Sequence, residues 1–243
     1  NFQKSGSFKA RGAFNAIMSL PDDASAVVTH SSGNHAAAVA LAARTRSLAA
    51  HIVMPHTAPH AKRHAVESYG ARLTPCEPTL AAREAEAKRL VAETGGVFVA
   101  PCDSTEVVAG QGTLFLEFLE DVGEPLDMVI VPVGGGGLLA GTALAAASRS
   151  PRTAIIGVEP AAADDAARGF RAGTRQPQVV PIATIADGVT TAMSEMTFSV
   201  MSWLVSDVVT VSEAGIVEAM KLIWSRLKIV VEPSCALPLA AIL

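Results

Sequence analysis

The sequence predicts an α/β fold with largely parallel sheets, and two observations carry this prediction. Short runs rich in β-branched residues alternate with longer alanine-rich stretches of helical period along the chain, which is the pattern of repeated β-α units. Half of the 243 residues are hydrophobic, so the chain can bury a substantial core. No low-complexity linker interrupts the pattern.

Each expected strand is a short apolar run bounded by glycine, proline or polar residues. These runs are Ala26 to His30, Ala50 to Met54, Leu73 to Glu77, Val97 to Ala100, Met128 to Val133, Ile155 to Glu159, Val208 to Val211 and Ile229 to Val231. Each expected helix has a helical apolar period, and several open with Ser, Thr or Pro. These are Asn34 to Arg44, Pro59 to Tyr69, Leu80 to Glu93, Glu106 to Asp121, Leu138 to Ser148 and Glu213 to Leu227.

Composition excludes several classes of function. Only 17% of the residues are charged, the net charge is -4 and no Lys/Arg run occurs, which argues against a nucleic-acid partner. No stretch reaches the ~18 consecutive apolar residues of a membrane span. Cys76, Cys102 and Cys235 form no Cys-x-x-Cys pair, so neither a disulfide framework nor a thiolate zinc site is expected. A cytoplasmic protein without a signal peptide is expected.

Two segments in the first part of the chain suggest a binding site. Lys9 lies among small residues in Ser5-Gly-Ser-Phe-Lys-Ala-Arg-Gly12, at the mouth of an expected helix, although alone it would be read as a surface lysine. Ser31-Ser-Gly-Asn-His35 follows a strand and opens a helix, where free N–H groups suit an anion. One helix N-cap needs only one such side chain, so this run indicates a loop that binds a carboxylate or a phenolic oxygen.

The loop Gly134-Gly-Gly-Gly137 follows an apolar strand and precedes a helix, an arrangement that cradles phosphate. It has a second interpretation, because Gly135-x-Gly137-x-x-Ala140 fits the dinucleotide fingerprint and Glu159 ends the next strand. That interpretation predicts an NAD(P)-dependent oxidoreductase. This segment alone does not distinguish the two interpretations. The dinucleotide interpretation, however, assigns no function to Lys9 or to the loop from Ser31 to His35.

With all these segments in view, the sequence resembles the fold-type II pyridoxal phosphate enzymes, and within them the serine racemase and serine/threonine dehydratase group, which includes 3-hydroxyaspartate dehydratase. The motifs that carry the resemblance are Gln3-Lys-Ser-Gly-Ser-Phe-Lys, Thr29-His-Ser-Ser-Gly-Asn-His, Ala109-Gly-Gln-Gly-Thr113, the glycine loop, Ile185-Ala-Asp-Gly188 and Val231-Glu-Pro-Ser234. Their order along the chain is far more specific than any one motif.

The resemblance implies a tryptophan synthase β-like fold of two open parallel-sheet α/β domains with the cofactor between them. Residues 1–25 and 104–243 would form the large cofactor-binding domain, and residues 26–103 the small substrate-loop domain. Family members begin earlier and continue to a Ser-Gly-Gly-Asn stretch whose hydroxyl partners the pyridine nitrogen, so the large domain is expected to be incomplete at both ends. The family also implies a homodimer.

The same resemblance implies roles for individual residues. The catalytic pair would be Lys9, which holds pyridoxal 5'-phosphate as a Schiff base and acts as the base, and Ser32 on the opposite face of the substrate. The implied cofactor-binding residues are Phe8, Lys9, Asn34, Gly134, Gly135, Gly136, Gly137, Leu138, Gly188 and Glu232. The implied substrate-binding residues are Ser31, Ser32, Asn34, His35 and Arg83, the last for a second acid group. A divalent cation, Mg²⁺ or Ca²⁺, would bind Glu159, the Ala163 carbonyl and Asp165.

Simpler interpretations stand beside these roles. Arg83 could be a solvent-facing helix residue, and Glu159 with Asp165 could form a capped turn before a helix. His56, His60 and His64 are four residues apart, but no cysteine or acid completes a tetrahedral metal site with them.

The implied activity is β-elimination from a hydroxy amino acid, such as serine, threonine or 3-hydroxyaspartate, to a keto acid and ammonia, with racemisation as the competing outcome. Substrate choice stays open, because Ala36 stands where relatives often have glycine, and Cys102-Asp103 stands where serine racemase has Asn-Gln. A non-catalytic homologue also stays open as an interpretation.

Overall fold

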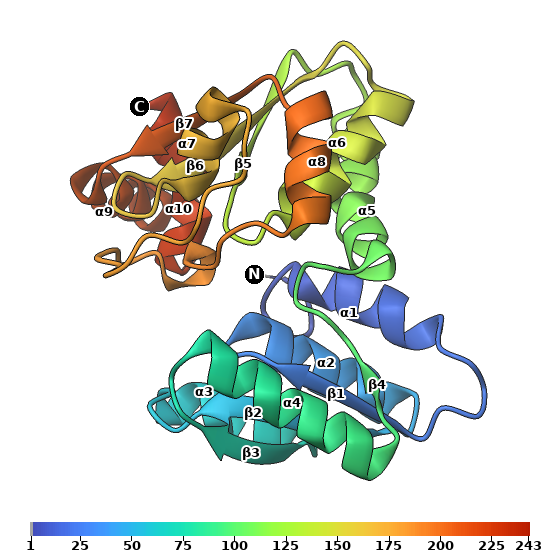
Figure 1. Cartoon of the computed structure of the whole chain (residues 1–243). Helices are drawn as coiled ribbons and strands as arrows, with labels where there is room; N and C mark the ends of the chain where they lie inside the picture. Colours follow the sequence, from blue (N-terminus) through green and yellow to red (C-terminus); the bar gives the residue numbers. More distant parts are fainter. Residues whose placement is uncertain (1) are drawn as a thin grey trace. The chain divides into compact units, whose positions relative to one another are not determined.

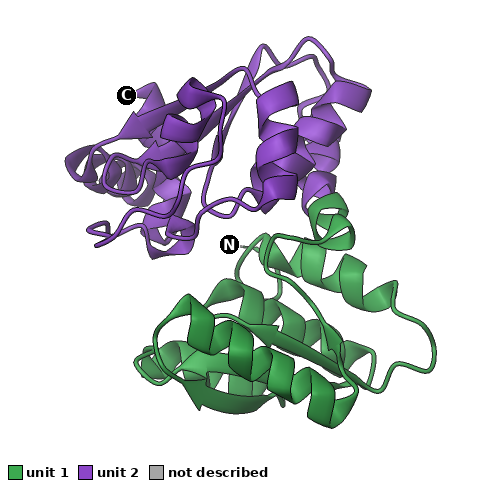
Figure 2. Cartoon of the chain, in the orientation of Figure 1, with its two compact units in different colours: residues 1–110 green, residues 111–243 purple. Residues whose placement is uncertain are grey.

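The computed structural model describes residues 2–243 and divides into two compact units, residues 1–110 and residues 111–243 (Figure 2). Each unit is built on its own parallel sheet. None of the helices within residues 2–243 is long and apolar enough to cross a bilayer.

The first unit has a four-stranded parallel sheet in the order β3-β2-β1-β4 (Figure 1). Its strands are β1 (Ala26–His30), β2 (Ala49–Pro55), β3 (Arg72–Cys76) and β4 (Val97–Phe98). Its helices are α1 (Lys9–Met18), α2 (Asn34–Thr45), α3 (His60–Ser68) and α4 (Leu80–Thr94). The element order is therefore a run of β-α units, as the alternating pattern predicts.

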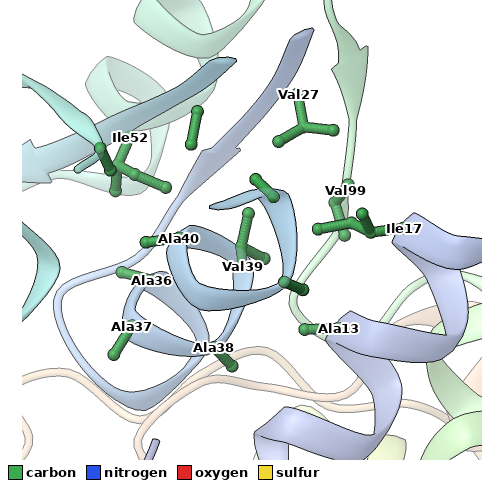
Figure 3. Close-up of a cluster of buried hydrophobic side chains, with 14 of the residues drawn as sticks. Ala13, Ile17, Val27, Ala36, Ala37, Ala38, Val39, Ala40, Ile52 and Val99 are labelled. Atoms are coloured by element: carbon green, nitrogen blue, oxygen red, sulfur yellow. The ribbon is translucent and has the colours of Figure 1, made fainter. Parts of the chain in front are cut away.

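Alternation along the strands divides the core of the first unit between the two faces of the sheet. Val27 and Ile52 pack with α1 and α2 (Figure 3), whereas Val28 and Val53 pack against α4. The α1–α2 side is filled largely by alanines of α2, all of them buried from residue 36 to residue 38. The small side chains of α2 allow α1 to pack closely against it, with Ala13 and Ile17 in the same core cluster as Val27.

The second unit has a three-stranded parallel sheet in the order β5-β6-β7. Its strands are β5 (Met128–Pro132), β6 (Ala154–Pro160) and β7 (Asp207–Val211). Its helices are α6 (Gly137–Arg149), α7 (Asp165–Ala172), α8 (Glu195–Leu204), α9 (Glu213–Leu222) and α10 (Pro233–Ile242), with α5 (Thr105–Val122) running into it from the first unit. A 3-10 turn covers Asp187–Val189, and a π-helical turn, Ile223–Leu227, extends α9.

Helices cover both faces of the second sheet. The side chains of Val131, Ile155 and Val208 belong to a core cluster with α6 and α8. On the other side, Val158 and Val211 pack with α9 and α10. The sheet is therefore buried on both faces, as parallel sheets usually are.

The predicted strand Ile229 to Val231 is wrong. This segment has no strand structure and connects the π-helical turn, which ends at the left-handed residue Lys228, to Pro233 at the start of α10. Val230 is 80% exposed. The β-branched run has no neighbouring strand with which to pair, so its local preference is not expressed.

The compact units differ from the predicted domain division at the N-terminus. Because Ala13, Ala16 and Ile17 of α1 pack with α2, residues 1–25 join the first unit rather than the second. The sheets follow the predicted division, since the four-stranded sheet lies within residues 26–103 and the three-stranded sheet within residues 104–243. The predicted domain boundaries stay a prediction.

Candidate active site

Lys9 is the first residue of α1, and its amine points at the chain that follows β4. Its Nζ donates a hydrogen bond to the carbonyl oxygen of Pro101 at 2.9 Å and lies 5.4 Å from the centre of the Phe8 ring. Burial lowers the pKa of Lys9, and the nearby Cys102 raises it by a smaller amount. A lowered pKa increases the fraction of neutral amine, which is the form that a nucleophilic or basic lysine needs.

Three side chains from three different elements hold the segment Val99 to Pro101. Besides Lys9, Thr29 of β1 donates from Oγ1 to the Val99 carbonyl oxygen at 2.7 Å. His35 of α2 binds the same oxygen through Nε2 at 3.2 Å. The carbonyl that receives the Lys9 amine is therefore fixed by its neighbours along the chain.

His35 is a neutral imidazole. Burial and the charge of Lys9 lower its pKa to about 3, and a carbonyl can only accept, so Nε2 carries the proton. Nδ1 is buried with no hydrogen-bond partner among residues 2–243. The predicted contact of His35 with the substrate carboxylate stays a prediction, and Nε2 is already engaged with Val99.

The loop from Ser31 to Asn34 joins β1 to α2 and presents an uncapped helix N-terminus. The Ser31 hydroxyl accepts from the Gly33 N–H at 3.2 Å, and no side chain caps α2. Lys62 of α3 lies nearby, with Nζ 3.7 Å from the position a Cβ atom on Gly33 would take. Uncapped N–H groups, the positive helix end and a lysine together favour an anion here.

Arg83 of α4 lies close enough to His30, the last residue of β1, for its positive charge to affect the pKa of that histidine. Burial and then Arg83 lower the pKa of His30. The Nε atom of Arg83 donates to the Thr79 carbonyl at 3.4 Å.

The glycine loop of the second unit has the form of an anion cradle. Gly136 is the N-cap residue of α6, with φ of 82°, a left-handed conformation that glycine adopts readily. The first hydrogen bond of this helix runs from the Ala140 N–H to the Gly136 carbonyl at 2.8 Å. Among the described residues, the N–H groups of residues 134–138 make no hydrogen bond to protein. These donors are available to a phosphate.

Side chains are also excluded from this loop. A Cβ atom on Gly134 would lie 2.7 Å from the Cα of Val189, and one on Gly136 would lie 2.9 Å from the Cβ of Thr197 and would collide with Met193. The cradle therefore needs glycine for space as well as for conformation.

Gly188 and Glu232, both predicted ring contacts, lie close together in the second unit. A Cβ atom on Gly188 would lie 3.4 Å from Oε1 of Glu232. The Gly188 N–H donates to Oγ of Ser234 at 3.0 Å, and the Ile185 N–H donates to Oε2 of Glu213 at 2.9 Å. The segment from Ile185 to Gly188, which leads into the 3-10 turn, is thus held at both ends.

Comparison with known proteins decides the family. The family model described as pyridoxal-phosphate dependent enzyme matches residues 1–243. The chain belongs to the pyridoxal-phosphate dependent enzyme family. The NAD(P) interpretation is therefore dropped, and the phosphate-binding role of the glycine loop stays a prediction.

Individual relatives are similar over the whole of this pyridoxal-phosphate dependent enzyme. It is 47% identical to the beta-hydroxyaspartate dehydratase of Paracoccus denitrificans (strain Pd 1222), covering 100% of this chain and 77% of that protein. The structure of maize serine racemase has a TM-score of 0.96 and 46% identity, over 99% of this chain and 73% of that one. The crystal structure of a threonine deaminase from T.th. has a TM-score of 0.94 and 44% identity, over 99% and 79%.

The residues of this pyridoxal-phosphate dependent enzyme fit its cofactor on structural grounds. Lys9 offers an amine with a lowered pKa for the aldehyde. The loop from Gly134 to Leu138 offers backbone donors without competing acceptors, which suit the phosphate. When bound, the cofactor would draw electrons from the α-carbon of an attached amino acid.

The predicted cation residues lie in one turn of the second unit. Glu159, at the end of β6, is 1% exposed and accepts from the N–H groups of Ala166 at 3.2 Å and Ala167 at 2.8 Å. Burial raises the pKa of Glu159 to about 8 and that of Asp165 to about 6. Glu159 thus caps α7 directly. Two buried acids also suit a divalent cation, so the predicted site stays a prediction.

The three spaced histidines do not form a metal site. His60 and His64 stack at 6.2 Å between ring centres, while His56 lies before α3 and contacts the Cys76 carbonyl at 3.0 Å. Within residues 2–243, no group of three or more His, Cys, Asp or Glu residues could hold a metal ion.

Sequence reasoning missed several supporting residues. Ser234 and Thr29 each lie in a motif that carries the family resemblance, which offered a signal, but Glu213 and Thr197 lie in none. Their hydroxyl or carboxylate groups act through contacts between segments that are far apart along the chain.

Proposed function

We propose that this enzyme catalyses pyridoxal phosphate-dependent β-elimination from a hydroxy amino acid, giving a keto acid and ammonia, with 3-hydroxyaspartate as the preferred substrate over serine or threonine. The observation that carries the proposal is the Lys9 amine, partly buried, lowered in pKa and bound to the fixed Pro101 carbonyl. Relatives named for dehydration, deamination and racemisation of such amino acids support it.

Lys9 and the phosphate loop have different roles toward the cofactor. The loop from Gly134 to Leu138 would anchor the phosphate, and Asn34, Gly188, Phe8 and Glu232 would hold the ring. The Nζ atom of Lys9 would accept the α-proton of the substrate. The Pro101 carbonyl accepts a hydrogen bond from this amine when the lysine is free, which orients the nitrogen.

The substrate carboxylate is received at the start of α2. The hydroxyls of Ser31 and Ser32 and the N–H groups of Asn34 and His35 supply donors there, reinforced by the positive end of the helix. Arg83 receives the second carboxylate of 3-hydroxyaspartate. The support for this role is that its charge already reaches His30, next to the loop, and that a guanidinium pairs well with a carboxylate.

Ser32 determines which of two products forms. Its hydroxyl group, in an exposed residue of the loop, can deliver a proton to the face of the substrate opposite Lys9. Delivery to the α-carbon gives racemisation, whereas loss of the β-hydroxyl gives elimination. The relatives named serine racemase favour this second activity as a side reaction.

Finer properties follow from the same resemblance. A divalent cation bound by Glu159, Asp165 and the Ala163 carbonyl would neutralise two buried acids. A homodimer, as the family resemblance implies, and a cytoplasmic location complete the proposal. The three free cysteines are compatible with a reducing compartment.

The proposal is tested by the absorption spectrum and the products of the purified protein. We expect a band near ~410 nm from the Schiff base of the bound cofactor, absent from Lys9→Ala, and release of keto acid and ammonia from 3-hydroxyaspartate. Protein that stays colourless with added cofactor would refute the proposal. Coloured protein that releases no keto acid from any of the three substrates would refute the lyase assignment.

A further inference from the structure

Thr197 of α8 binds the phosphate loop from behind. Its side chain is fully buried, and Oγ1 donates to the carbonyl oxygen of Gly135 at 2.9 Å. The Ser194 N–H donates to the same Oγ1 at 3.1 Å, which occupies a lone pair and leaves the hydroxyl proton for Gly135. Two other acceptors lie farther from Oγ1, the Ser194 hydroxyl at 3.1 Å and the Ser194 carbonyl at 3.3 Å, so the contact with Gly135 is the shortest open to that proton.

This bond fixes the orientation of one peptide unit. The Gly135 carbonyl and the Gly136 N–H belong to the same peptide, which is planar and trans, so the two groups point in opposite directions. When Thr197 holds the carbonyl toward α8, the Gly136 N–H is directed away from α8. Glycine on both sides would otherwise let this peptide rotate at little cost.

Neighbouring residues hold Thr197 in place. Ser194 and Thr197 form a capping box, in which the Thr197 N–H donates to Oγ of Ser194 at 3.2 Å. Met193 packs against Gly136, and Arg175 holds this turn by binding Glu195 at 2.6 Å and the Met193 carbonyl at 3.4 Å. The start of α8 is therefore a rigid support behind the loop.

We infer that Thr197 is a positioning residue for cofactor phosphate: it locks the Gly135–Gly136 peptide so that the Gly136 N–H joins those of Gly137 and Leu138 as a phosphate donor. The inference rests on the proposed function for the identity of the anion. Thr197 itself makes no contact with the phosphate, and its effect passes through the peptide alone.

The test compares two cofactor forms that differ only in the phosphate. Apoenzymes of wild type, Thr197→Val and Thr197→Ser are titrated with pyridoxal 5'-phosphate and with pyridoxal, and the dissociation constants are measured from the absorption band. Valine keeps the shape and removes the hydroxyl. We expect Thr197→Val to weaken pyridoxal phosphate binding about tenfold, the size of one hydrogen bond, and to leave pyridoxal binding within about twofold. Serine should restore wild-type binding of both.

Thr142→Val is the matched control. Thr142 is also buried, in α6 directly after the loop, and its hydroxyl has no hydrogen-bond partner among the described residues. We expect this variant to bind both compounds as wild type does.

Equal weakening of pyridoxal and pyridoxal phosphate in Thr197→Val would mean a merely structural role and would overturn the inference, as would unchanged binding of both. If Thr197→Val does not fold, the same ratio is measured for Thr197→Ala at low temperature and for Thr197→Ser. A loss confined to pyridoxal phosphate in the alanine variant, restored by serine, supports the inference. Wild type that binds neither compound would refute the proposed function instead.

Discussion

His35 donates its Nε2 proton to the carbonyl oxygen of Val99, 3.2 Å away, two residues before the carbonyl that accepts from Lys9. These two hydrogen bonds make the imidazole one of the groups that hold the segment to which Lys9 is bound. They also explain why a histidine beside a substrate loop is neutral, because protonation would place a second cation beside Lys9 in a buried environment.

The first prediction concerns pH and His35. Its pKa is about 3 in the folded protein, below the ordinary 6.5, so the unfolded chain binds the proton first as pH falls. Stability from this group is therefore present above pH 6.5 and is lost as pH falls toward 3. In His35→Gln the side-chain amide can still donate to the Val99 carbonyl. Between pH 7.5 and 5.5 the free energy of unfolding should fall by about 1 kcal/mol less in this variant than in wild type. Urea unfolding at both pH values measures this, and identical pH dependence in the two proteins would contradict it.

The second prediction concerns the space around Gly136. Alanine there must adopt a left-handed φ of 82° and also collides with Met193 and Thr197. We expect Gly136→Ala to lower cofactor affinity by more than tenfold, since the phosphate donors are displaced. Gly173→Ala is the control, because Gly173 has a similar φ of 67° with nothing nearby. It should cost about 1–2 kcal/mol of folding stability and leave cofactor affinity unchanged.

The third prediction concerns the second carboxylate of the substrate. Removing Arg83 should reduce kcat/KM for 3-hydroxyaspartate at least tenfold, the usual size of a charged hydrogen bond, and leave kcat/KM for serine nearly unchanged. Arg89→Ala is the control on the same helix, because Arg89 is paired with Glu86 and Glu93 at the surface. Equal turnover of 3-hydroxyaspartate by wild type and Arg83→Ala would exclude the role.

The fourth prediction concerns the cation. Added Mg²⁺ or Ca²⁺ should raise the melting temperature of wild type, because binding to the folded state alone stabilises it. Asp165→Asn should abolish this rise, whereas Glu120→Gln, which removes an exposed acid of α5, should keep it. A rise of the same size in Asp165→Asn would place the cation elsewhere.

The sequence was sufficient for the β-α units because each has a strong local pattern. Strand runs such as Met128–Pro132 and the alanine-rich α2 are recognisable without tertiary information. Ile229 to Val231 has the same local preference but no neighbouring strand, so local preference misleads there. The short helices α7 and α8 were missed because they lack a long apolar period. The start of α7 is capped by Glu159 from the preceding strand, and that of α8 by the capping box of Ser194 and Thr197.

Some residues of the candidate site could also be predicted from the sequence, and others could not. Lys9 and the glycine loop stand out because their residue types are unusual for their positions. The groups that orient them do not, because Pro101 acts through a backbone carbonyl and Thr197 through a hydroxyl 62 residues away from its partner. Such contacts depend on the folded arrangement, which residue type and spacing alone do not specify.

The central claim is that Lys9 carries the cofactor, and reductive trapping tests it most directly. The protein is loaded with pyridoxal phosphate, reduced with borohydride, digested and analysed by mass spectrometry. We predict a single modified peptide with the cofactor on Lys9, and loss of that modification in Lys9→Ala. Cofactor attached to another lysine, or no attachment to the wild-type protein, would contradict the account.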